Sequence, residues 1–166
     1  MNVRKLVVLS FMICAALVLY GVENMIPAIM PVPGVKLGLA NTVTPVVMYL
    51  YGRKEAFAVL ILRIFIAALL FGQAVSLAFS LSGGVMCLLA CSVAKGAFDE
   101  SQLWAMGIIG AVAHNAGQIG AAIILTGQTA IAYYFLVLLI AGMITGALTG
   151  MCASYCVRLI RKHKFI

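Results

Sequence analysis

The chain has 166 residues, of which 65% are hydrophobic and only 9% are charged, and its mean hydropathy is +1.18. A soluble globular domain carries about 25% charged residues, so this composition excludes a soluble domain and indicates a protein of the lipid bilayer. The net charge of +7 comes from Lys and Arg residues scattered singly or in pairs. Nucleic-acid-binding proteins instead carry a dense basic stripe with interleaved aromatic residues, so that class of partner is excluded as well.

The apolar segments predict a single all-α membrane domain over residues 1–166, with about six transmembrane helices, because one span takes about 20 apolar residues. The first segment has a basic flank like a secretory signal, but the lack of a clear small-residue cleavage site favours a retained helix. A proline-rich loop follows it, and Pro45 is expected to kink the second helix. The helices are expected, in chain order, at roughly residues 5–22, 37–51, 56–71, 77–93, 103–125 and 130–157.

Basic residues alternate between the ends of these helices. They occur at residues 4–5, at residues 53–54, at Lys95 and in the C-terminal segment, whereas the turns near Gln73 and Gly127 carry no charge. Because Lys and Arg collect in cytoplasmic loops, both termini are expected to be cytoplasmic. On the outer side only Lys36 and Glu23 are charged, and both are expected to lie in the proline-rich loop.

Arg63 lies about ten residues into its helix, which is near mid-membrane at about 1.5 Å per residue. An arginine at that depth costs at least about 2.5 to 3.5 kcal/mol unless it faces the bundle interior or water. No acidic residue is expected inside any span to pair with it. We therefore expect either a site for an anionic or polar ligand or a structural arginine whose guanidinium is satisfied by backbone carbonyls.

The fifth helix carries three polar residues in an apolar run. A rotation of about 100° per residue places His114 and Gln118 on one stripe, with Asn115 at its shoulder. Asn41 begins the second helix near its outer end, and Lys36 precedes it by about one turn. We expect these residues and the buried arginine to line one cavity that opens outward. The alternatives are interhelical hydrogen bonds for the fifth helix and a solvated loop position for the lysine.

The last helix repeats Gly142, Gly146 and Gly150 at intervals of four residues, a pattern that lets membrane helices pack closely. The partner of this stripe is a helix either of this chain or of another subunit. The five cysteines fall inside apolar runs and are expected to be small packing residues, not metal ligands or disulfides. No catalytic set and no phosphate-binding loop emerges, so we expect neither an enzyme nor a cofactor.

Four stretches carry a resemblance to a known family: PGVKLGLAN (33–41), LILRIF (60–65), SLSGG (80–84) and AHNAGQ (113–118). They resemble the Gx transporter family, long labelled heptaprenyl diphosphate synthase component I, whose members are similar to the S components of energy-coupling factor (ECF) transporters. The resemblance implies an S-component bundle in the bacterial cytoplasmic membrane, partnered by a membrane coupling protein and cytoplasmic ATPases. It also implies a vitamin-like substrate, with a flavin or another anionic cofactor or precursor as the candidate.

The first helix departs from the S-component pattern. S components often dock the coupling protein through an Ala-x-x-x-Ala pair on this helix, and here Ser10 and Cys14 provide a small-residue substitute. The older label of the family suggests a second class of function. In that interpretation the chain is a non-catalytic membrane scaffold that recruits a soluble prenyl diphosphate synthase for quinone biosynthesis.

Overall fold

The computed structural model describes residues 3–25, 38–71 and 74–162 and places only helices and connecting turns in them, which confirms the all-helical prediction for these residues. The proline-rich loop with Lys36 and the turn at Gln73 lie outside the described residues. The α-helices are α1 (Val3–Met25), α2 (Val43–Leu50), α3 (Arg53–Phe71), α4 (Ala74–Ala94), α5 (Leu103–Thr126) and α6 (Phe135–Lys162). Three short 3-10 helices join them: η1 (Leu39–Thr42), η2 (Glu100–Gln102) and η3 (Thr129–Tyr134).

Four stretches are long and apolar enough to cross a membrane, namely Val3–Met25, Val75–Ala94, Leu103–Thr126 and Thr129–Lys162. The length and composition of these helices are those of membrane-spanning segments. The helix α3 has 19 residues and is largely apolar, but it carries four charged side chains, Arg53, Lys54, Glu55 and Arg63. The predicted number of six full spans is not confirmed for the described residues.

The second predicted span is shorter than expected. The helices η1 and α2 have four and eight residues, which together reach about 18 Å, well below the roughly 30 Å of a hydrocarbon core. Pro45 lies in the first turn of α2. The N–H groups of a first turn make no hydrogen bond within the helix, so a proline there costs none. It is therefore tolerated at this position of α2, and the predicted kink stays a prediction.

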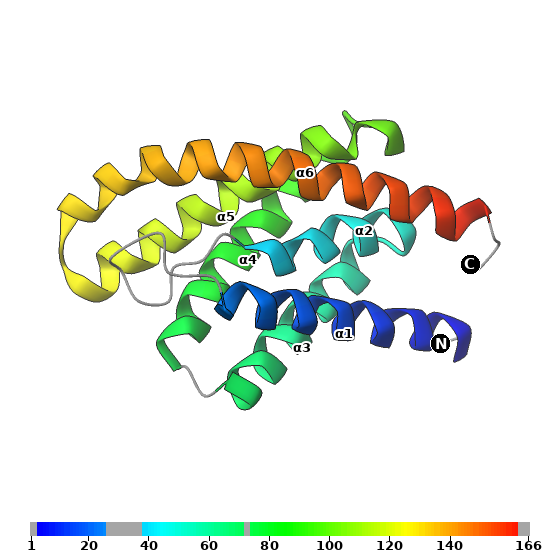
Figure 1. Ribbon diagram of the computed structural model, residues 1–166, viewed down its shortest axis with the longest axis horizontal. Helices are drawn as coiled ribbons and strands as arrows, with labels where there is room; N and C mark the ends of the chain where they lie inside the picture. Colours follow the sequence, from blue (N-terminus) through cyan, green and yellow to red (C-terminus); the bar gives the residue numbers. More distant parts are fainter. Residues whose placement is uncertain (1–2, 26–37, 72–73, 163–166) are drawn as a thin grey trace.

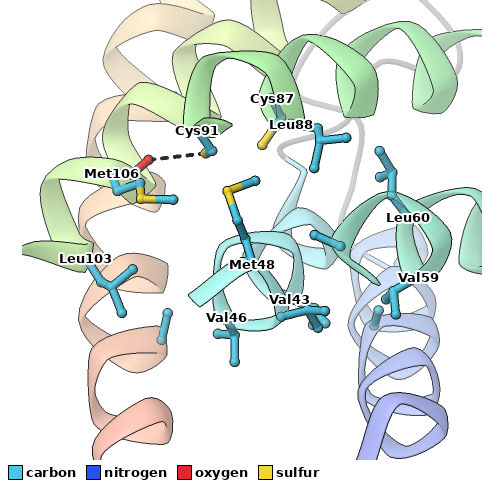
Figure 2. Packing of buried hydrophobic residues seen from close by; sticks show 14 of the residues in the cluster. Val43, Val46, Met48, Val59, Leu60, Cys87, Leu88, Cys91, Leu103 and Met106 are labelled. Carbon is cyan, nitrogen blue, oxygen red and sulfur yellow. Dashed lines mark hydrogen bonds between the residues drawn. The ribbon is translucent and has the colours of Figure 1, made fainter. Parts of the chain in front are cut away.

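The short helix α2 lies inside the bundle, in contact with α1, α3, α4, α5 and α6. All six residues from Val43 to Met48 are buried, which is why α2 is apolar without facing lipid. Figure 2 shows Met48 pointing toward α4, where Cys87 and Cys91 lie, with Met106 of α5 beside them. These two cysteines are thus part of the apolar core, and Cys91 Sγ lies 3.8 Å from the carbonyl oxygen of Met106.

The helices α5 and α6 run side by side along one flank of the bundle (Figure 1). Their contact is so close that a Cβ atom on Gly146 would lie 2.6 Å from the carbonyl oxygen of Gly107. A Cβ on Gly150 would lie 2.5 Å from the carbonyl oxygen of Leu103. The glycine stripe of the last helix, including Gly142, therefore packs against α5 of the same chain.

The basic residues gather at one end of the bundle, where both chain termini lie (Figure 1). Two contacts tie the helix ends together there: Lys5 Nζ of α1 lies 2.5 Å from Glu55 Oε1 of α3, and Arg53 donates to the carbonyl of Ser92 at 2.7 Å. We call this the cationic end. Its described Lys and Arg residues are Arg4, Lys5, Arg53, Lys54, Lys95, Arg158, Arg161 and Lys162.

Candidate functional site

A cluster of buried polar side chains lies between α1, η1, α3, α4 and α5. Four of the residues predicted for a binding site meet in it: Asn41, Arg63, His114 and Gln118 line one small cavity. Their exposed fractions are 6%, 4%, 3% and 2%, so water reaches none of these side chains freely. The same cavity is lined by residues that the sequence did not single out as ligand-binding: Tyr20, Glu23, Gly38, Ala40 and Ser80.

Asn41 connects the arginine to the histidine. Its Oδ1 accepts a hydrogen bond from a terminal nitrogen of Arg63, and its Nδ2 lies 2.7 Å from His114 Nδ1. The chain of contacts thus runs from α3 through η1 to α5. Asn41 lies in η1, directly before the buried helix α2, and its side chain is buried inside the bundle.

Two glycines make room for the imidazole of His114. Gly38 has a φ of +82°, a left-handed conformation that disfavours other residues, and a Cβ there would lie 2.7 Å from His114 Cδ2. A Cβ on Gly83 of α4 would lie 2.5 Å from both His114 Cε1 and Nδ1. The ring is therefore held between two backbone segments without side chains. This gives a physical reason for glycine in the stretches GVKLGLAN and SLSGG.

Two polar atoms of the lining have no hydrogen-bond partner among the described residues: Arg63 Nε, a donor, and Gln118 Oε1, an acceptor. A buried polar atom without a partner costs about 1 to 3 kcal/mol, so such atoms are normally paired with protein, water or a ligand. The cavity measures about 10 Å³, roughly the space that one water molecule needs. A larger ligand therefore requires the lining to open.

Glu23 corrects the expectation that no acidic residue lies inside a span. The helix α1 continues to Met25, so Glu23 belongs to this helix and not to the loop, and it is only 5% exposed. Its Oε1 accepts the backbone N–H of Gly38, and its carboxylate attracts the guanidinium of Arg63. The sequence shows only that Ala16, Tyr20 and Glu23 have helical spacing, and the structure buries all three on one face of α1.

Asn115 lies apart from this cavity. Its Nδ2 donates to the carbonyl of Leu138 on α6 at 2.8 Å, which is the interhelical hydrogen bond that the sequence left as an alternative. Lys36 lies outside the described residues. A further interhelical contact was not anticipated: the hydroxyls of Tyr20 on α1 and Ser76 on α4 lie 2.8 Å apart. Ser10 and Cys14, predicted for partner docking, are exposed on α1.

Comparison with known proteins gave one match. The family model described as heptaprenyl diphosphate synthase component I matches residues 12–156, which is most of the 166 residues of the chain. No curated protein and no solved structure matches the chain. The matched segment runs from the first half of α1 to the last turns of α6, so it contains the whole polar cluster.

Proposed function

Since the chain belongs to the family described as heptaprenyl diphosphate synthase component I, we propose that it is a non-catalytic membrane subunit that recruits a soluble prenyl diphosphate synthase to the bilayer. The observation that carries this proposal is the family match, because its description names one component of a synthase and thereby implies a second component. The apolar helices supply the membrane anchor. The catalytic chemistry belongs to the partner.

The cationic end is the surface that we assign to this partner. By the positive-inside rule it faces the cytoplasm of a bacterial cell, where a soluble enzyme can reach it. Eight of the described Lys and Arg residues lie there. Two of them, Arg161 and Lys162, are in the last turn of α6. A cluster of like charges favours a partner with an acidic surface, because complementary potentials speed association and orient the two proteins.

Co-purification tests this proposal. The tagged chain, extracted from membranes in a neutral detergent, is expected to retain a prenyl diphosphate synthase, and Arg161→Glu is expected to weaken the association. The control, Gln128→Glu, also introduces a glutamate, with half the change in net charge, at the exposed turn after α5 at the opposite end of the bundle (Figure 1). If the synthase stays in the soluble fraction with the unaltered chain, the scaffold function is rejected.

The polar cluster favours a second candidate, a substrate-binding subunit of an ECF-type transporter. The specific observation is the buried donor of Arg63 and the buried acceptor of Gln118, which face one cavity and have no partner among the described residues. A ligand that offers one acceptor and one donor would satisfy both atoms. In this function the chain works with a membrane coupling protein and cytoplasmic ATPases, and the substrate is a vitamin-like molecule such as a flavin.

A thermal-shift screen of the purified protein against flavins, thiamine and other vitamins tests the second candidate. The reporter should be global unfolding, because Trp104 is ten residues before His114 on α5 and thus about 15 Å away along the helix. A compound that stabilises the protein and loses its effect in Gln118→Ala supports the transport function. Co-purification of ATPases in place of a synthase separates the two candidates.

A further inference from the structure

A groove between α1 and α3 lies outside the polar cluster. Neither the scaffold function nor the transport function gives it a role. It has a volume of about 360 Å³ and begins at the cationic end. Its walls are apolar, with Leu6, Leu9 and Ile13 on α1 and Ala58 and Leu62 on α3. The side chains of Leu6 and Leu62 are 48% and 50% exposed, so the groove opens toward the lipid.

The groove runs along both helices. From Leu6 to Ile13 the wall on α1 covers seven residues, which is about 10 Å along the helix axis. Ser10 and Ala58 also line the groove. Because their side chains are small, they leave space between the larger residues of the lining. These dimensions suit a single hydrocarbon chain lying along the two helices.

The mouth of the groove carries excess positive charge. Residues 3–5 and 53–55 hold four cations and one carboxylate, Glu55, which is already paired with Lys5 at 2.5 Å. Arg53 is turned toward the carbonyl of Ser92. Lys54 lines the groove, is exposed, and makes no hydrogen bond or ion pair within the described residues. Glu55 also lines the groove, but its carboxylate is paired with Lys5, so an anionic group at the mouth would meet the ammonium of Lys54 in a region where cations outnumber carboxylates.

We propose that this groove binds an isoprenoid lipid with a terminal phosphate or diphosphate, the chain lying between α1 and α3 and the phosphate contacting Lys54. The isoprenoid part rests on the proposed scaffold function, because a heptaprenyl diphosphate synthase makes a lipid of this kind, as its name states. The bilayer is as apolar as the groove, so burial of the chain alone gives no preference. The preference comes from the phosphate–ammonium contact at one end of a groove that accepts a single chain.

Native mass spectrometry of the full chain in a neutral detergent, with farnesyl diphosphate as the probe, tests the proposal. One molecule per chain is expected to bind. Farnesol, which lacks the phosphates, and inorganic diphosphate, which lacks the chain, are expected to bind at least about tenfold more weakly, the scale of a lost hydrogen bond to a charged group. Phosphatidylglycerol, with two acyl chains, is expected not to displace the probe. Equal displacement by this lipid overturns the proposal, since the groove would then hold any anionic lipid.

Two pairs of variants locate the site. Lys54→Gln is expected to weaken binding roughly tenfold, while Lys162→Gln removes an exposed cation from the same end and is expected to leave binding unchanged. Ala58→Trp is expected to fill the groove and abolish binding, whereas Val18→Trp adds the same bulk at a lipid-exposed position of α1 outside it. If Ala58→Trp does not fold, Ala58→Leu replaces it. Equal effects within either pair overturn the proposal.

The results of this test and of the scaffold test can reject the two proposals independently. If the variants of the groove lose the probe but still co-purify with the synthase, both proposals stand. If farnesyl diphosphate does not bind while the synthase is retained, the groove loses its assignment and the scaffold function remains. If the probe binds as expected and no synthase is retained, the isoprenoid site stands without the scaffold.

Discussion

Arg63 and Glu23 line the same cavity, and substitution of the arginine leads to a quantitative prediction about stability. Arg63→Gln removes the guanidinium that donates to Asn41 Oδ1 and attracts the carboxylate of Glu23. Loss of this buried donor leaves Asn41 Oδ1 without its hydrogen bond from Arg63, and a buried polar atom without a partner costs about 1 to 3 kcal/mol. For a domain of 150–250 residues each kcal/mol lowers the melting temperature by about 2 to 4 °C, so the expected loss is about 2 to 12 °C.

The double variant gives the decisive comparison. With Glu23→Gln added to Arg63→Gln, no uncompensated charge is left, and the amide of residue 23 can still accept the N–H of Gly38. We expect the double variant to be more stable than Arg63→Gln alone and the two effects to be non-additive by about 1 to 3 kcal/mol. Thermal unfolding in detergent, followed by circular dichroism, measures all four proteins of the cycle. Lys162→Gln, at an exposed lysine, is the control and should change stability by less than about 0.5 kcal/mol. A melting temperature of Arg63→Gln equal to that of the unaltered protein, or strictly additive effects, would refute the coupling.

Two further predictions concern the histidine pocket and the orientation of the bundle. Gly83→Ala should lower the melting temperature by forcing the ring of His114 out of place, with partial recovery in the double variant Gly83→Ala/His114→Ala. Gly120→Ala is the control, because a Cβ there meets nothing within 4 Å, and it should be neutral or stabilise α5 by up to about 1 kcal/mol. Equal losses of melting temperature at both glycines contradict the packing argument. In a cysteine-free background, a cysteine at position 128 should react with an impermeant maleimide in whole cells, and one at position 99 only after permeabilisation. The reverse pattern would place the cationic end outside.

The hydropathy of the sequence predicts the helical class well but not the depth of each helix. Residues 43–50 are as apolar as a lipid-facing segment, yet α2 is short and surrounded by protein. An apolar run indicates only that a segment avoids water. It does not distinguish a segment that faces lipid from one in the interior of a bundle. Arg63 shows the opposite limit, because it is one of four charged residues that make α3 less apolar than a typical span, although its guanidinium is buried in the bundle.

The polar cluster was partly predictable because polar groups in an apolar bundle need one another. That requirement joins Asn41, Arg63, His114 and Gln118, which the structure places around one cavity. Asn115 was assigned to the same cavity but is rotated by about 100° from His114, enough to turn its amide toward α6. Sequence periodicity gives the relative angles on one helix, but only the packing of its neighbours decides which angle faces the cavity.

Glu23 changes the argument about the ligand. An anionic substrate was expected because Arg63 lacked an acidic partner, and the carboxylate of Glu23 on the same cavity removes that reason. An added anion would gain the attraction of Arg63 but meet the repulsion of Glu23 in a site from which water is largely excluded. A neutral or zwitterionic molecule avoids this conflict and can still bond Arg63 Nε and Gln118 Oε1. The buried cluster therefore suits a ligand without net charge, and the excess positive charge that suits an anion lies at the cationic end, beside the groove of α1 and α3.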